Sequence, residues 1–245
     1  MGDVDYTGVA YAPRRRTDPR IAAYVTAALG DARTVVNVGA GAGSYEPPGR
    51  RVLAVEPSEA MLAQRPPGAA PAVRAVAEAL PLADRSVDAA MATVTVHQWG
   101  DPERGLAELR RVARGPVVVL TFDPDALDLL WLAEYAPELV AAERRRYLPP
   151  ARMADLLGGG TVTPVPVPVD CVDGFTEACY ARPEAFLDEG VRRAQSAWTF
   201  VPRAAEDRAV ARLAADLADG TWDARYGALR DQPTFPGSLR LVVSA

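Results

Sequence analysis

Short apolar runs alternate with longer helical stretches over the first half of this 245-residue chain, and this alternation constrains the fold more than any other feature. Residues 20–29 have a helical pattern and lead into residues 34–38, an apolar run rich in β-branched valine. Further runs with strand character lie at residues 51–55, 72–76, 87–92 and 116–122, and an amphipathic helical stretch lies at residues 103–114. Because parallel strands need such long connections, the pattern predicts an α/β fold with a doubly wound, mostly parallel sheet.

The second half of the chain departs from this rhythm. Residues 124–147 have a helical pattern, residues 161–169 form an extended run with three prolines, and residues 173–230 are mostly helical. A last apolar run lies at residues 239–243. Since proline has no N–H group to give to a sheet, we expect the proline-containing strand at or near the sheet edge, beside the last strand.

The long helical stretch lies between these two neighbouring strands, so it cannot be a tight hairpin. We expect it to form a lid over the carboxyl ends of the strands, where ligands bind in open α/β sheets. Phe175, Tyr180 and Trp198 would then wall an apolar cavity. The alternative is a layer that packs on the outer sheet edge or on a second subunit. The predicted parts are a core of residues 1–170, a lid of residues 171–232 and a last core strand within residues 233–245.

Composition excludes several classes of chemistry. All 27 basic residues are arginine, so a Schiff-base lysine and the lysines of P-loop enzymes and protein kinases are impossible. With one histidine and only Cys171 and Cys179 as cysteines, we expect no metal site and reduced thiols. The net charge of −5 offers no basic excess for binding phosphates, so we expect a small-molecule substrate and no nucleic acid.

Hydropathy argues against a membrane partner. No apolar run is long enough to span a bilayer, and residues 1–10 lack the basic start and apolar core of a signal peptide. We therefore expect a cytoplasmic protein that is a monomer or a homodimer.

A glycine-rich turn directly follows the first predicted strand. Glycines at positions 39, 41 and 43 let the backbone turn tightly and approach a ligand closely. Glu56 follows the second predicted strand, where an acidic side chain can accept hydrogen bonds from a ribose diol. An NAD site would need Gly-x-Gly-x-x-Gly, and position 44 is serine, so the turn suits a ligand without phosphates. The alternatives are that the glycine turn is purely structural and that Glu56 is a solvated loop carboxylate.

Several ordered blocks together resemble the class I S-adenosylmethionine-dependent methyltransferases, within them the type 11 group. The blocks are Val35 to Gly43, Ala54 to Ser58 with Met61, Ala77 to Leu82, Ser86 to Ala89, His97 to Trp99 and Leu106 to Val112. The resemblance covers about residues 20–122 and implies a Rossmann-like sheet with an antiparallel last strand, and S-adenosyl-L-methionine as cofactor.

The resemblance also implies a role for each matching position. The glycines would line the methionine and ribose, Glu56 would hold the ribose hydroxyls, and Pro57 or Met61 would touch the adenine face. Asn37 stands where the family usually has an acid. The predicted cofactor-binding residues are Tyr11, Arg16, Asn37, Gly39, Ala40, Gly41, Gly43, Glu56, Pro57, Met61, Ala77, Glu78 and Thr93. Of these, Tyr11 and Arg16 would hold the methionine carboxylate, unless the segment before the first helix is only a solvated arm.

His97 is the one conventional candidate for a general base near neutral pH. Its alternative role is to wall the pocket. Arg144 to Arg146 is interpreted as a solvated helix face. The predicted function is methyl transfer to O, N or C of a small, partly apolar metabolite, mainly by positioning. The alternative is a protein that binds S-adenosylmethionine without methylating, such as a cyclase or a regulatory subunit.

Overall fold

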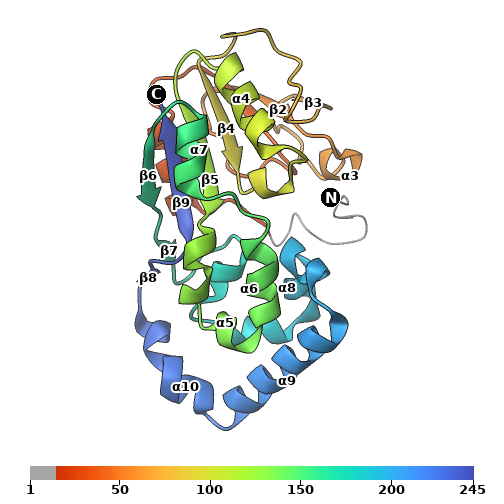
Figure 1. The fold of residues 1–245 in the computed structure, drawn as a ribbon, viewed down its shortest axis with the longest axis vertical. Coiled ribbons are helices and arrows are strands. Elements are labelled where there is room, and N and C mark those ends of the chain that lie inside the picture. Colours follow the sequence, from red (N-terminus) through yellow and green to blue (C-terminus); the bar gives the residue numbers. More distant parts are fainter. Residues whose placement is uncertain (1–14) are drawn as a thin grey trace.

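A seven-stranded sheet forms the centre of the molecule. The computed structural model describes residues 15–245, and the sheet has the strand order β3-β2-β1-β4-β5-β9-β6 (Figure 1). Strands β1 to β5 are parallel, and β9 runs antiparallel to both of its neighbours. The strands are β1 (Thr34–Val38), β2 (Arg51–Val55), β3 (Ala72–Val73), β4 (Ala89–Thr93), β5 (Val117–Phe122), β6 (Thr161–Pro164) and β9 (Leu239–Ser244). The doubly wound, mostly parallel sheet with an antiparallel last strand is thus confirmed.

Helices cover both faces of this sheet. Val35 belongs to the buried cluster that packs on α2 (Pro19–Ala28), and Val36 belongs to the cluster that packs on α4 (Pro102–Val112) and α7 (Pro150–Leu156). Because successive side chains of a strand point to opposite faces, the apolar runs supply both layers at once. A short helix, α3 (Glu59–Leu62), follows β2 at the edge of the parallel half.

The proline-containing segment, residues 161–169, begins with a strand at the predicted sheet edge but does not form one continuous strand. β6 pairs only with β9 and ends at Pro164, and the chain then forms β7 (Val167–Pro168), which pairs with β8 (Thr234–Phe235) in a separate two-stranded sheet. The prediction of a single strand over residues 161–169 is therefore wrong, because prolines at alternate positions cannot donate to a continuing ladder. The third and fourth strands are also shorter than the predicted residues 72–76 and 87–92.

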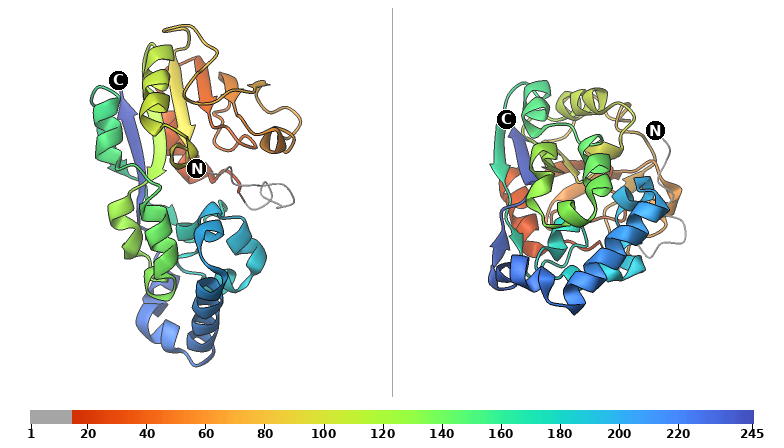
Figure 2. Two further views of the ribbon diagram at one scale, coloured as in Figure 1. Left: turned by 45° about the vertical axis from the view of Figure 1, so that its right-hand side comes forward. Right: turned by 60° about the horizontal axis from the view of Figure 1, so that its bottom comes forward.

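A helical body lies beyond the carboxyl ends of the parallel strands (Figures 1 and 2). Residues 173–230 are mostly helical, as predicted, and short helices after β5 join the same body. Its elements are η2 (Pro124–Leu129), α5 (Leu132–Tyr135), α6 (Pro137–Arg144), η3 (Thr176–Cys179), η4 (Pro183–Leu187), α8 (Glu189–Arg193), η5 (Ser196–Phe200), α9 (Arg203–Ala218), α10 (Thr221–Tyr226) and η6 (Gly227–Asp231). The body thus draws on more of the chain than residues 171–232. A further short helix, η1 (Val96–Gln98), follows β4 at the same edge of the sheet.

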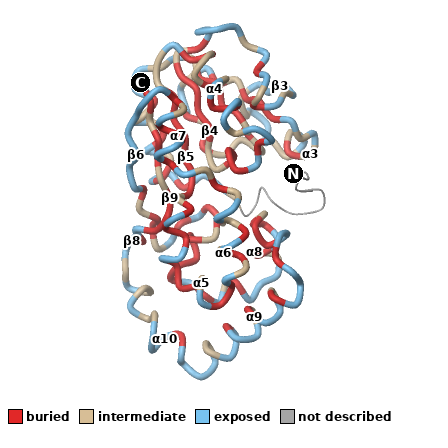
Figure 3. The backbone as a smooth tube through the Cα atoms, in the orientation of Figure 1, coloured by how far each residue is buried: buried red, intermediate tan, exposed pale blue. Residues whose placement is uncertain are grey.

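The sheet and the helical body share one continuous apolar core. A single cluster of buried residues runs from Ile21 on α2 to Trp222 on α10, and Figure 3 shows the buried chain passing from one part into the other. The indole N–H of Trp131 donates to the carbonyl oxygen of Tyr180, 2.7 Å away, inside the body. This shared core fixes the body over the sheet edge.

Three negative findings hold for residues 15–245. No helix there has both the length and the apolar character needed to cross a bilayer. No group of three or more His, Cys, Asp or Glu side chains is arranged to hold a metal ion. Cys171 and Cys179 are both buried and form no disulfide.

Candidate active site

The glycine turn after β1 adopts a backbone that requires glycine. Gly39 and Gly41 have φ angles of 68° and 51°. A Cβ on Gly39 would lie 2.1 Å from Oγ1 of Thr95. The backbone N–H of Gly39 donates to the carbonyl oxygen of Val55, 2.8 Å away, so the turn is attached to the end of β2. Any larger residue at position 39 would force the turn away from β4.

Glu56 links the glycine turn to the end of β2. Its side chain is 6 % exposed, its Oε2 accepts a hydrogen bond from the backbone N–H of Gly41 at 2.8 Å, and its Oε1 accepts one from Ser58 N–H at 2.9 Å. Each carboxylate oxygen can accept more than one hydrogen bond. The carboxylate is therefore held in place by the backbone while it can still receive hydroxyl donors.

These elements enclose a cleft of about 650 Å³, which we call the outer cleft. It lies along the carboxyl ends of the parallel strands. The predicted cofactor-binding residues that line it are Gly39, Ala40, Gly41, Glu56, Pro57, Met61, Ala77, Glu78 and Thr93. The structure thus brings together residues from four separate sequence blocks around one space.

The other predicted cofactor-binding residues lie elsewhere. Asn37 is fully buried within β1, and neither of its amide atoms has a hydrogen-bond partner among the described residues. Gly43 lies against the guanidinium of Arg65 instead of lining the cleft. Arg16 is exposed and lines neither of the two spaces at this edge of the sheet, whereas its neighbour Arg15 lines the outer cleft. Tyr11 falls outside the described residues.

Residues from the helical body complete the outer cleft. Arg146 and Phe200 both line it, and the Arg146 guanidinium lies 4.5 Å from the centre of the Phe200 ring. The same guanidinium donates to Oγ of Ser196 at 3.3 Å. The interpretation of Arg144 to Arg146 as a solvated face is therefore wrong for Arg146, because the following chain folds back over it. Thr95 and Trp99, in the segment after β4, also line the cleft.

A second, narrower cavity lies deeper, between the carboxyl ends of β4 and β5 and the helical body. This inner cavity measures about 40 Å³ and adjoins the outer cleft, since Arg15, Val94 and Gln98 line both. Its walls are largely apolar and come from both parts of the molecule. The apolar lining residues are Val94, Phe122, Leu127, Leu130, Leu132, Ala133, Leu139, Val140 and Phe175.

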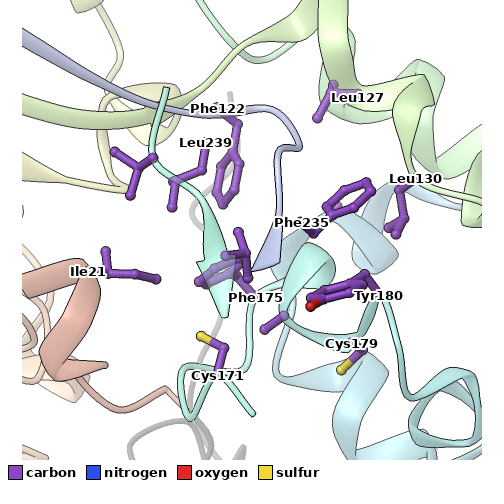
Figure 4. Packing of buried hydrophobic residues seen from close by; sticks show 14 of the residues in the cluster. Ile21, Phe122, Leu127, Leu130, Cys171, Phe175, Cys179, Tyr180, Phe235 and Leu239 are labelled. Carbon is purple, nitrogen blue, oxygen red and sulfur yellow. The ribbon is translucent and has the colours of Figure 1, made fainter. Parts of the chain in front are cut away.

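Of the three aromatic residues predicted to wall this cavity, only Phe175 does so. The Phe175 ring lies 5.4 Å from that of Phe122, centre to centre (Figure 4). Tyr180 instead stacks on Phe235, with 5.1 Å between ring centres, and Trp198 donates its indole N–H to Gln195. Neither lines the inner cavity or the outer cleft, so both belong to the core of the body.

His97 lines the inner cavity from η1. Its side chain is 4 % exposed, its ring centre lies 4.5 Å from that of Tyr147, and its Nδ1 has no hydrogen-bond partner among residues 15–245. Burial, reinforced by the positive charges of Arg146 and Arg15, holds the pKa of His97 well below its ordinary value. The imidazole is therefore neutral at pH 7 and only weakly basic.

Two carboxylates line the same cavity, and sequence reasoning missed both. Burial raises the pKa of Glu143 to about 7; the positive charges of Arg146 and Arg15 oppose this rise, and the negative charge of Glu177 adds to it. Burial also raises the pKa of Glu177, against the hydrogen bonds it receives from Ser238. The one sequence signal for Glu143 was its position four residues after Leu139, on the inward face of α6.

Comparison with known proteins adds three findings. Residues 36–120 match the family model described as a methyltransferase domain, Methyltransf_11. A crystal structure from Anabaena variabilis, described as a candidate methyltransferase of an antibiotic biosynthesis pathway, has 28% sequence identity and a TM-score of 0.89, covering 96% of this chain and 100% of that chain. An S-adenosylmethionine-dependent methyltransferase from Thermotoga maritima has 26% identity and a TM-score of 0.50, covering 60% of this chain and 74% of that chain.

Likeness of fold also extends to an enzyme with other chemistry. The [4+2]-cyclase SpnF has 15% identity and a TM-score of 0.52, covering 91% of this chain and 79% of that chain. At this identity the likeness concerns the fold alone. A search of curated proteins finds no match.

Proposed function

From the premise that the chain belongs to the class I S-adenosylmethionine-dependent methyltransferases of the type 11 group, we propose that it transfers a methyl group to O, N or C of a small, partly apolar molecule. Its cofactor is S-adenosylmethionine. The observation that carries the proposal is the junction at Arg15, Val94 and Gln98, where the outer cleft opens onto a largely apolar inner cavity.

The residues of the outer cleft fit this cofactor. At Gly39 the neighbouring Thr95 side chain and a φ of 68° require glycine, which keeps the turn in the shape that lines the cleft. Glu56 would accept hydrogen bonds from the ribose hydroxyls, and the side chains of Pro57 and Met61 offer apolar surface to the adenine. When bound, the cofactor supplies a methyl group on a positively charged sulfur.

The inner cavity would take the acceptor. Its apolar lining suits a partly apolar molecule, and the net charge of −5 favours a small molecule over a nucleic acid. The cavity adjoins the outer cleft at Arg15, Val94 and Gln98, so an acceptor bound there would lie next to the cofactor.

Catalysis would rest mainly on positioning. Alignment of an acceptor with an activated methyl group can lower the barrier by roughly 7 to 11 kcal/mol, whereas a general base adds about 10² to 10⁴-fold. His97 is buried on the acceptor side, and its lowered pKa makes it a weak base. We therefore assign His97 to the wall that orients the acceptor.

A transfer assay tests the proposal. The protein is incubated with methyl-labelled S-adenosylmethionine and a panel of small apolar amines, phenols, carboxylic acids and enols, and products are separated by mass spectrometry. The expected result is a labelled product together with S-adenosylhomocysteine. Cofactor that binds tightly but keeps its label against the whole panel would contradict methyl transfer.

That contrary result would favour the second candidate, a protein that binds the cofactor without methylating. The fold shared with a [4+2]-cyclase and the fully buried, uncharged Asn37 support this candidate. In that case an acceptor would be converted into an isomer of unchanged mass, which the same mass spectra would detect.

A further inference from the structure

Two carboxylates face the inner cavity without a cation paired to them. Glu143 lies in the last turn of α6 and Glu177 lies in η3, and both line the cavity. Glu177 is 3 % exposed, and its Oε1 accepts a hydrogen bond from Ser238 N–H at 2.7 Å, whereas its Oε2 has no hydrogen-bond partner in the described chain. Within residues 15–245, neither carboxylate belongs to an ion pair.

The arginines near this cavity form no ion pair with Glu143 or Glu177 among residues 15–245. The Nε of Arg15 donates to Oδ1 of Asp173 at 2.6 Å, and Asp173 is itself fully buried. Arg146 lies against Phe200 and donates to Oγ of Ser196, which lines the inner cavity, while its Nε has no hydrogen-bond partner in the described chain; its charge lowers the pKa of Glu143 against the effect of burial. The other titratable groups facing Glu143 are Glu177, His97 and Tyr147, and none of these carries a positive charge at pH 7.

An uncompensated carboxylate in an apolar cavity is costly. Removing such a charge from water destabilises the protein by several kcal/mol unless a partner or a proton neutralises it. Two of them in one cavity add mutual repulsion. In the free protein protonation relieves this cost, as the raised pKa values of both carboxyl groups show, and a cationic ligand can take the place of that proton.

We infer that the inner cavity binds a small amine, with its apolar body against the leucine and phenylalanine walls and its cationic nitrogen near Glu143 and Glu177. This inference rests on the proposed function only in taking the inner cavity as the acceptor site. It narrows the acceptor to a class of molecule, because an alcohol or a carboxylic acid of the same shape would leave the two carboxylates unpaired or repelled.

The affinity for an amine should depend on pH. Because Glu143 has a pKa of about 7 in the free protein, a cationic ligand must displace a proton from it to pair with the carboxylate. Amine binding should therefore release protons at pH 7. Its affinity should rise about tenfold between pH 6 and pH 8, while the amine itself stays protonated throughout.

Calorimetry on the full chain saturated with S-adenosylhomocysteine tests this directly. The probes are phenethylamine and cyclohexylmethylamine, compared with phenethyl alcohol and cyclohexylmethanol. We expect each amine to bind at least tenfold more tightly than its alcohol at pH 8, and buffers of different ionisation enthalpy to reveal proton release on binding. Glu143→Gln and Glu177→Gln should each reduce the preference for amine, and Glu143→Gln should flatten its dependence on pH.

Glu138→Gln is the matched control, since Glu138 lies on α6 but is ion-paired with Arg208 on the surface. This control should leave the preference unchanged. Alcohols that bind as well as the amines, or amines that fail to bind, would each overturn the inference. Failure to bind S-adenosylhomocysteine at all would instead contradict the proposed function, so the two failures are distinguishable. Proton release in the unmodified protein needs no variant, so misfolding of a variant leaves that test intact.

Discussion

The outer cleft and the inner cavity adjoin each other but are built in different ways. The outer cleft takes most of its lining from short segments that directly follow consecutive strands, such as Gly39 after β1 and Glu56 after β2. The inner cavity takes most of its lining from the helical body, with residues as distant in the chain as Leu127 and Ser196. One site is thus fixed by backbone geometry at a sheet edge, and the other by the packing of short helices.

This difference indicates how far the cofactor site and the acceptor site can each change. A turn that requires glycine tolerates little substitution, so the cofactor site is rigid in chemistry and in shape. Side chains on short helices can be exchanged while the core is kept, so the acceptor site can diverge between proteins that share the fold. Mutations at the two sites should therefore separate cofactor affinity from acceptor turnover.

Replacing Gly39 should have the largest effect. In Gly39→Val the new side chain would meet Thr95 and the φ of 68° would be strained, so the turn must move away from its place between β2 and β4. We expect S-adenosylhomocysteine affinity to fall by at least about 100-fold in calorimetry. Gly49→Val is the control, because Gly49 has a similar φ of 75° but open space around it. Equal losses in both variants would show that strain alone, and not the shape of the cleft, is responsible.

Replacing Glu56 should have the next largest effect. Glu56→Ala removes the acceptor for the ribose hydroxyls and for Gly41 N–H, so cofactor affinity should weaken by about 1.5 to 3 kcal/mol. Glu59→Gln removes an exposed charge from the same cleft and should change affinity little. Unchanged affinity in a correctly folded Glu56→Ala protein would remove Glu56 from the cofactor site.

The same contrast explains what the sequence could predict. Strands β1 and β2 have the predicted bounds, because unbroken apolar runs between polar turns fix them locally. The residues of the outer cleft could be found for the same reason, since each follows a strand end. Glu143, Arg146 and Phe200 could not, because they reach the site only when separate helices fold back on the sheet edge. Each of these side chains in isolation resembles an ordinary residue of a helix surface.

Asp18 connects α2, beside the sheet, with the helical body, and replacing it tests how much this connection stabilises the fold. Its buried side chain caps α2 through Arg20 N–H at 3.0 Å and also accepts from Val172 N–H, at the start of the body, at 3.2 Å. Burial raises its pKa, but the hydrogen bonds from Arg20 and Val172 outweigh burial and hold the pKa at about 2. Because this folded-state value is below the unfolded one, the stabilisation is present above about pH 4 and is lost as the pH falls towards 2.

Asp18→Ala should therefore lower the free energy of unfolding by about 1 to 2 kcal/mol at pH 7, and by less at pH 3. Urea denaturation at both pH values measures the difference. Asp101→Ala serves as control, because Asp101 caps α4 at an exposed site and makes no hydrogen bond to the helical body. A loss no larger in Asp18→Ala than in this control would show that the contact with Val172 adds nothing.

The smallest effect should come from His97, and it bears most directly on the division between the two sites. His97 lines the inner cavity and not the outer cleft, so His97→Asn should leave S-adenosylhomocysteine affinity unchanged while raising the KM for the acceptor. Since burial holds the pKa of His97 well below its ordinary value and leaves the imidazole a weak base, the variant should keep the shape of the pH–rate profile and lose less than about tenfold in kcat.

Thr93→Val is the corresponding variant for the outer cleft. Thr93 lines only that cleft, and valine keeps the shape of the threonine side chain. This variant should weaken cofactor binding and leave the acceptor KM unchanged. A fall of more than about 100-fold in kcat for His97→Asn, with loss of one limb of the pH–rate profile, would instead identify His97 as a general base. Because the measurement compares cofactor affinity with acceptor turnover in the same two variants, it also shows whether the two sites act separately on either side of Arg15, Val94 and Gln98, the residues common to both.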